Sequence, residues 1–190
     1  MDVFHYEGYK IYIGEAPCHS FQSANNKSYD KIFEIENDNF EFKKSIEIKT
    51  NFRGDTHSVL IIASYCTPAR SFAALHRDGL FLMLNDILCV FDPKNLELSK
   101  KIKMYPMGTM FEVHPYGEDY ILYGECEIYR ISSDLNVQWQ FSGRDIFVRS
   151  RGKEPAFELQ KDRICLYDFE ENYYEVSYDG KVITDRPAIR

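Results

Sequence analysis

The sequence has few of the patterns that mark a metal site or a common catalytic motif. Its five histidines are dispersed, whereas zinc sites usually contain closely spaced ligand pairs. The one close pair, Cys18-His19, would point its side chains in opposite directions in a strand. The chain also has no nucleophile elbow and no glycine-rich loop with the spacing of a P-loop or a dinucleotide-binding motif. We therefore expect neither a metal ion nor a cofactor.

Long apolar runs are absent as well. Nothing approaches 18 consecutive apolar residues, so no segment is expected to cross a membrane. The opening stretch "MDVFHYEGYKIYIG" has no basic start and no small-residue cleavage site, so we do not expect a signal peptide. The odd number and wide spacing of the cysteines favour reduced, buried thiols over a disulfide framework; they are Cys18, Cys66, Cys89, Cys126 and Cys165. These features together predict a cytoplasmic protein.

Positive charge is in the minority, with 23 Lys and Arg against 30 Asp and Glu and a formal net charge of −7. An acidic surface repels phosphate backbones, and no basic stripe overrides it, so nucleic acid is not expected as a ligand. A basic protein partner suits this charge better, because opposite potentials speed encounter. The solubility of a globular protein would equally account for an acidic surface.

Alternation of apolar and polar residues with a period of two runs through most of the chain. It predicts strands at 9–14, 31–36, 45–50, 59–64 and 79–84, bounded by Gly, Asn, Asp and Pro clusters. The best helical candidate is 67–79, yet the alternation around it favours a strand near 72–75. The 14 Tyr and 14 Phe suit half-buried strands as well as protein interfaces. We expect a single all-β domain over residues 1–190.

A repeat occupies the second half of the chain. Residues 80–102, 120–141 and 163–183 each read as strand, polar turn, strand, second turn and strand. The second turns align Asn95, Asp134 and Asp179, which are separated by 39 and 45 residues. Four-stranded β-propeller blades repeat at about 40–50 residues, so the period fits that architecture.

The segments between the repeats are expected to supply the fourth strands, at 109–114 and at 144–150. In "WQFSGRDIFV" (139–148), "WQF" would end one unit, "SG" would turn, and "DIFV" would begin the next. Trp139 and Phe141 share one face of their strand, where they would seal one unit against its neighbour. Asp145 is expected to bind backbone donors at the turn.

The two stretches Tyr129–Trp139 and Tyr174–Val182 resemble the repeats of bacterial quinoprotein-type β-propellers, and the resemblance extends over 79–185. It departs in that only one unit carries the tryptophan, while residues 1–78 show no clear unit. The resemblance implies a fold and no particular function. We expect a β-propeller-like stack of about four small antiparallel sheets, with degenerate β units in 1–78. The sequence leaves open whether the stack closes into a ring, and it does not indicate the oligomeric state.

The first turn of each repeat is acidic and lies beside aromatic residues, and equivalent turns of stacked repeats emerge at one edge. An acidic rim interleaved with tyrosines suits a basic protein partner, although solvated hairpin turns would also be polar. The predicted partner-binding residues are Asp86, Tyr123, Glu125, Tyr167, Asp168, Phe169, Glu170, Glu171 and Tyr173.

The leading functional hypothesis is a non-enzymatic binding protein, specifically a bacterial immunity protein that neutralises a cationic toxin. One alternative is a hydrolase with a carboxylate site or a Cys/His site in a central cavity, for which Cys18 and Cys66 are the candidate nucleophiles. The other is a scaffold or sensor module in a bacterial assembly. No catalytic residue is assigned.

Overall fold

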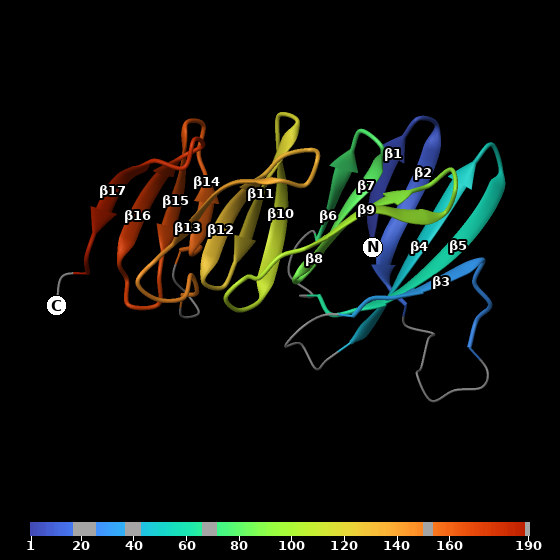
Figure 1. Cartoon of the computed structure of the whole chain (residues 1–190), viewed down its shortest axis with the longest axis horizontal. Helices are drawn as coiled ribbons and strands as arrows, with labels where there is room; N and C mark the ends of the chain where they lie inside the picture. The colour runs from blue at the N-terminus through green and yellow to red at the C-terminus, as the bar shows by residue number, and fades with distance from the viewer. Residues whose placement is uncertain (17–25, 37–42, 66–71, 150–153, 189–190) are drawn as a thin grey trace. The chain divides into compact units, whose positions relative to one another are not determined.

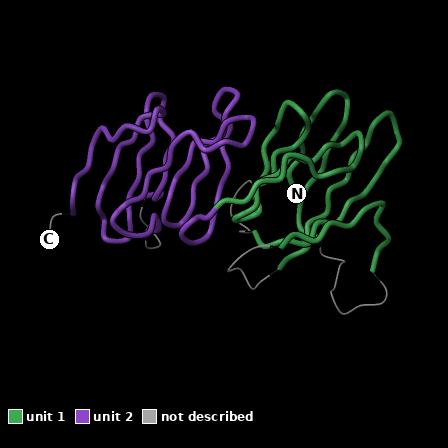
Figure 2. The backbone as a smooth tube through the Cα atoms, viewed as in Figure 1, with its two compact units in different colours: residues 1–104 green, residues 105–190 purple. Residues whose placement is uncertain are grey.

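A computed structural model describes residues 1–16, 26–36, 43–65, 72–149 and 154–188. Over these residues the backbone forms strands, turns and irregular segments, which confirms the all-β prediction. No helix in this part of the chain has the length and apolar character needed to cross a membrane. Two compact units divide the chain, residues 1–104 and residues 105–190 (Figure 2).

Unit 1 begins with a five-stranded sheet, which we call sheet A. The spatial order of its strands is β1-β2-β4-β5-β3, and all neighbours are antiparallel except β3 and β5 (Figure 1). This parallel pair makes sheet A unlike a simple four-stranded blade. Its strands are β1 (Asp2–Tyr6), β2 (Tyr9–Glu15), β3 (Lys31–Glu34), β4 (Lys44–Phe52) and β5 (Asp55–Ala63).

Sheet B completes unit 1 as a four-stranded antiparallel meander in sequence order. Its first strand lies at the position where the sequence favoured a strand over a helix. All side chains of β7 and nearly all of β8 are buried, as their continuous apolar runs suggest. The strands are β6 (Ala73–His76), β7 (Gly79–Leu84), β8 (Ile87–Asp92) and β9 (Glu97–Lys103).

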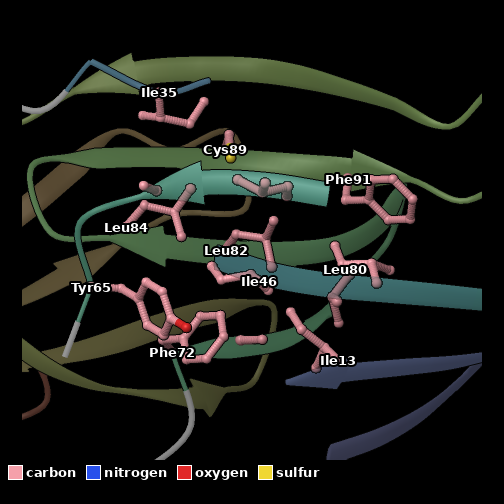
Figure 3. Close-up of a cluster of buried hydrophobic side chains, with 14 of the residues drawn as sticks. Ile13, Ile35, Ile46, Tyr65, Phe72, Leu80, Leu82, Leu84, Cys89 and Phe91 are labelled. Atoms are coloured by element: carbon pink, nitrogen blue, oxygen red, sulfur yellow. The ribbon is translucent and has the colours of Figure 1, made fainter. Parts of the chain in front are cut away.

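The core of unit 1 lies between sheets A and B. Ile13 and Ile46 come from sheet A, and Leu82 and Phe91 come from sheet B (Figure 3). Cys89 is fully buried in this core, and burial raises the pKa of its thiol to about 12. The thiol is therefore protonated and unreactive at neutral pH, as expected for a structural cysteine.

Unit 2 consists of two four-stranded antiparallel meanders, sheets C and D, again in sequence order. Both follow the repeat that the sequence predicted, including a strand at 110–116. Sheet C contains β10 (Met110–Tyr116), β11 (Asp119–Gly124), β12 (Glu127–Ile131) and β13 (Val137–Ser142). Sheet D contains β14 (Phe157–Leu159), β15 (Arg163–Tyr167), β16 (Tyr173–Ser177) and β17 (Val182–Arg186).

Backbone geometry confirms the alignment of the three repeats. The residue after each aligned Asn or Asp adopts a left-handed conformation, with φ of 56° at Leu96, 64° at Leu135 and 79° at Gly180. In sheets B, C and D alike, the register shifts between the third and fourth strands. The same turn thus recurs in each sheet and is followed by a bulge, which lies beside the turn in sheets C and D and farther along the strands in sheet B. Each of these sheets has the form of a propeller blade.

The prediction of a strand at 144–150 was wrong: the described residues 144–149 form an irregular connection, and the strand that completes sheet D is β14. The Phe147 amide donates to the Glu125 carbonyl at 2.5 Å, and the Ile146 carbonyl accepts from the Phe169 amide at 2.8 Å. These backbone groups therefore bind turns of two different sheets instead of forming a ladder. The apolar Ile146–Val148 run reflects the complete burial of Phe147.

Trp139 joins sheet C to sheet D, as its position in the repeat predicted. Its indole N–H donates to the Tyr178 carbonyl at 2.9 Å, and the ring lies against Gly180. Phe141 on the same face makes an edge contact with Tyr174 of sheet D, at 5.5 Å between ring centroids. Aromatic residues of both sheets thus build the core of unit 2.

Candidate partner-binding edge

The β11–β12 turn of sheet C and the β15–β16 turn of sheet D, which are the first turns of their sequence repeats, lie at one edge of unit 2 and are joined through the connection between the sheets. We call the turn 124–127, the connection 143–149 and the turn 168–172 the first-turn edge. The Phe147 amide bonds to Glu125 in one turn, and the Phe169 amide bonds to Ile146 in the connection. The Ile146 amide is in turn capped by the Asp145 carboxylate at 2.8 Å, the role predicted for Asp145.

Asp168 organises the turn of sheet D from within. Its carboxylate is fully buried and accepts hydrogen bonds from the Asn172 amide at 2.9 Å, the Asn172 side chain at 2.8 Å and the Tyr174 hydroxyl at 2.7 Å. The same Tyr174 hydroxyl accepts the Arg144 amide at 2.9 Å, and Arg144 forms a two-pronged ion pair with Asp185. The turn is therefore fixed to both the connection and the last strand.

Three of the predicted partner-binding residues are buried, which corrects their assignment to an exposed rim. Asp168 holds its own turn, and Tyr123 donates its hydroxyl hydrogen to the Phe147 carbonyl while its ring stacks on Phe157 at 4.4 Å. Asp86 is also buried and belongs to unit 1. A position in a turn does not determine whether its side chain points outward or folds back beneath the turn, so the sequence pattern did not separate these residues from the exposed ones.

The other predicted residues of sheet D fall into two groups. Some contact neighbouring side chains, and the others are exposed. Glu171 forms an ion pair with Arg149 at 2.6 Å, and the Arg149 guanidinium lies over the Tyr167 ring at 4.1 Å. Tyr173 lies on the outer face of sheet D and donates to Glu175 at 2.9 Å. Phe169 is 57% exposed, and the adjacent Glu170 is exposed as well. The exposed part of the rim is therefore narrower than predicted.

Negative charge gathers around Cys126 at this edge. Burial raises the pKa of its thiol, and so do the nearby carboxylates of Glu125, Glu127 and Asp145. Glu127, which the sequence did not single out, is buried and accepts the Met107 amide at 2.9 Å, the Gln140 side chain at 3.2 Å and the Tyr129 hydroxyl. The only feature of the sequence that could have identified Glu127 is its position in a strand directly after an acidic turn.

The described residues contain no group of three His, Cys, Asp or Glu side chains placed to hold a metal ion. Cys165 is a buried thiol that accepts a hydrogen bond from Tyr173 at 3.4 Å, and burial raises its pKa. Such a thiol is a poor nucleophile. The candidate nucleophiles Cys18 and Cys66, and His19 beside the first, lie outside the described residues.

No family model matches the chain, and no curated protein matches it. Among solved structures, BamB from Moraxella catarrhalis is similar over 74% of this chain at 9% identity, with a TM-score of 0.45. The AfRom2 CNH domain is similar over 77% at 10% identity, also with a TM-score of 0.45. The aligned regions cover 46% and 48% of those two chains, so this chain spans about half their length. Strand order and register, rather than these matches, identify the propeller-like fold.

Proposed function

We propose that this protein is a non-enzymatic binding protein that holds a basic protein partner at the first-turn edge of unit 2. The observation that carries the proposal is the rigid presentation of Phe169 and Glu170, on a turn fixed by the buried Asp168. The carboxylates of Glu125 and Asp145 lie along the same edge and add negative potential. Pre-organised surfaces lose less conformational entropy on binding, which favours a binding role for such a turn.

A narrower form of the proposal is that the partner is a cationic toxin domain and the chain is its immunity protein, working in the cytoplasm. The net charge of −7 supports attraction to such a domain. A scaffold that recruits another basic protein would use the same edge. In both cases association should slow as salt screens the opposing charges.

The test is charge reversal at this edge with a matched change elsewhere. Affinity capture from native cytosol at low salt would first identify a basic partner. With that partner, Glu125→Lys combined with Glu170→Lys should weaken binding at least about tenfold, because two attractive charges become repulsive. The purified proteins would be compared by calorimetric titration.

The control is Glu118→Lys combined with Asp134→Lys, which changes the net charge equally. These residues occupy the β10–β11 and β12–β13 turns, at the opposite edge of sheet C. The control should bind the partner within about twofold of the unmodified protein. Equal weakening by both double variants would indicate a general charge effect and reject the first-turn edge as the interface.

A further inference from the structure

Apolar side chains are exposed on the first-turn edge and on the segment 105–109, which is hydrogen-bonded to it. Met107 is 58% exposed and Phe169 is 57% exposed, while Tyr105, two residues before Met107, is 81% exposed. Large exposed aromatic and methionine side chains are enriched at the centres of protein interfaces. The sequence identified Phe169 through its acidic turn but gave no comparable signal for Met107.

Hydrogen bonds hold the Met107 segment beside the turn of sheet C. The Met107 amide donates to the buried Glu127 carboxylate at 2.9 Å, and the Thr109 amide donates to the Glu125 carboxylate at 3.2 Å. The Glu125 amide donates back to the Thr109 carbonyl at 2.8 Å. Gly108, with φ of 82°, lies so close that an added Cβ would be 2.6 Å from a Glu125 carboxylate oxygen. This segment is therefore built into the edge.

Backbone hydrogen bonds connect this segment to Phe169 in three steps. Thr109 pairs with Glu125, Glu125 pairs with Phe147, and the adjacent Ile146 pairs with Phe169. Backbones joined by such bonds lie about 4.8 Å apart and consecutive Cα atoms about 3.8 Å apart, so Thr109 and Phe169 are at most about 18 Å apart. Glu125 is a member of this series, and the Asp145 carboxylate is bonded to the amide of Ile146, another member.

From this arrangement we infer that the partner engages the edge through an amphipathic cationic segment. Its apolar side chains contact Met107 and Phe169, and its Lys or Arg side chains face Glu125, Asp145 and Glu170. A helical segment of about twelve residues is long enough to reach across this span. Charge complementarity selects this occupant over an acidic or neutral segment. The inference rests on the proposed function and adds the chemistry of the bound segment.

Two synthetic peptides of 14 residues would test it by calorimetric titration against the intact protein. One carries Lys with Leu at helical spacing, and the other has Ser in place of every Leu, so that the charges are equal. We expect the Leu peptide to bind at least about tenfold more tightly than the Ser peptide, because only it can cover the apolar side chains.

The test variant is Met107→Ser combined with Phe169→Ser, and it should remove the preference for the Leu peptide while leaving Ser-peptide affinity unchanged. The control is Val137→Ser combined with Val182→Ser, which changes two side chains of similar exposure on the outer strands of sheets C and D. The control should keep the preference. Circular dichroism would verify that both variants are folded.

The outcomes separate this inference from the proposed function. Suppose that both peptides bind equally and that Glu125→Lys combined with Glu170→Lys weakens their binding. This result would overturn the inference of an amphipathic partner segment and would support the acidic edge as the binding site. A preference for Leu that survives Met107→Ser and Phe169→Ser would also overturn it. Peptide affinities that do not respond to charge reversal would instead reject the proposed function, and this inference with it.

Discussion

Gly180 meets two requirements at once, a left-handed backbone and close contact with an aromatic ring. Its φ is 79°, and an added Cβ would lie 2.6 Å from Cγ of Trp139. Gly180→Ala should therefore destabilise unit 2 through both backbone strain, about 1–2 kcal/mol, and overpacking, about 1–3 kcal/mol more. Urea unfolding followed by circular dichroism would measure the loss.

Gly117 provides the matched control for that substitution. It has a left-handed φ of 59° and no heavy atom within 4 Å of an added Cβ. Gly117→Ala should cost only the backbone strain, about 1–2 kcal/mol. Equal losses at both positions would mean that Trp139 does not pack against Gly180 as described.

Glu175 offers a pH-dependent test on the outer face of sheet D. Hydrogen bonds from the Thr184 hydroxyl at 2.6 Å and the Tyr173 hydroxyl at 2.9 Å lower the pKa of Glu175 from its ordinary 4.5, and Arg163 lowers it further. A depressed carboxylate pKa stabilises the fold above pH 4.5, and this contribution disappears as the pH falls through the lowered value. Glu175→Gln should thus be less stable than the unmodified protein at pH 7, with the gap closing toward pH 3.

Unfolding at a series of pH values would measure that gap. Glu158→Gln removes an exposed carboxylate from β14 of the same sheet and serves as the control. Its stability relative to the unmodified protein should change little over the same range. A Glu175→Gln deficit that does not narrow as the pH falls below 4.5 would show that lost packing, rather than charge, causes it.

At the scale of elements, the connection 143–149 links the β11–β12 turn of sheet C to the β15–β16 turn of sheet D through backbone hydrogen bonds. Phe147 in its middle is fully buried, whereas Phe169, bonded to the neighbouring Ile146, is 57% exposed. Phe147→Ala should cost about 3–5 kcal/mol of unfolding free energy, as expected for a large buried aromatic. Phe169→Ala should cost less than about 0.5 kcal/mol.

Thermal and urea unfolding of the two alanine variants would provide this comparison within one small region. Similar losses would contradict the assignment of Phe147 to the core and Phe169 to the surface. A large loss at Phe169 would also weaken the proposed interface, because a residue required for folding is not a free contact residue.

Element positions were predictable where alternation and turns agree, as in β7, β11 and β15. The connection misled the prediction because Ile146-Phe147-Val148 has the composition of a strand. Its backbone bonds go to Glu125 and Phe169, which are distant in sequence, and composition does not reveal them. The sequence also did not show which turn residues are buried. Asp168 and Glu170 are both acidic and lie in the same turn, but Asp168 is buried and Glu170 is exposed.

At the scale of the whole molecule, the repeat predicted sheets B, C and D, whereas sheet A could not be predicted. Four of its five strands, β2 to β5, were predicted individually and β1 was not. The sequence did not show that β3 pairs in parallel with β5, because β4 lies between them in the sequence but on the other side of β5 in the sheet. Such long-range order depends on packing between sheets, here the isoleucines of sheet A against the leucines of sheet B. Each unit has its own apolar core, one between sheets A and B and the other between sheets C and D.

The single tryptophan gives this molecule a built-in optical reporter. Trp139 lies in unit 2, half-buried against the Tyr178–Gly180 turn, and its indole N–H is hydrogen-bonded there. Indole fluorescence is sensitive to the polarity around the ring, so its emission follows the separation of sheet D from sheet C. Residues 1–104 contribute no tryptophan signal. Comparing emission with far-ultraviolet dichroism, to which both units contribute, would reveal whether the two units unfold together.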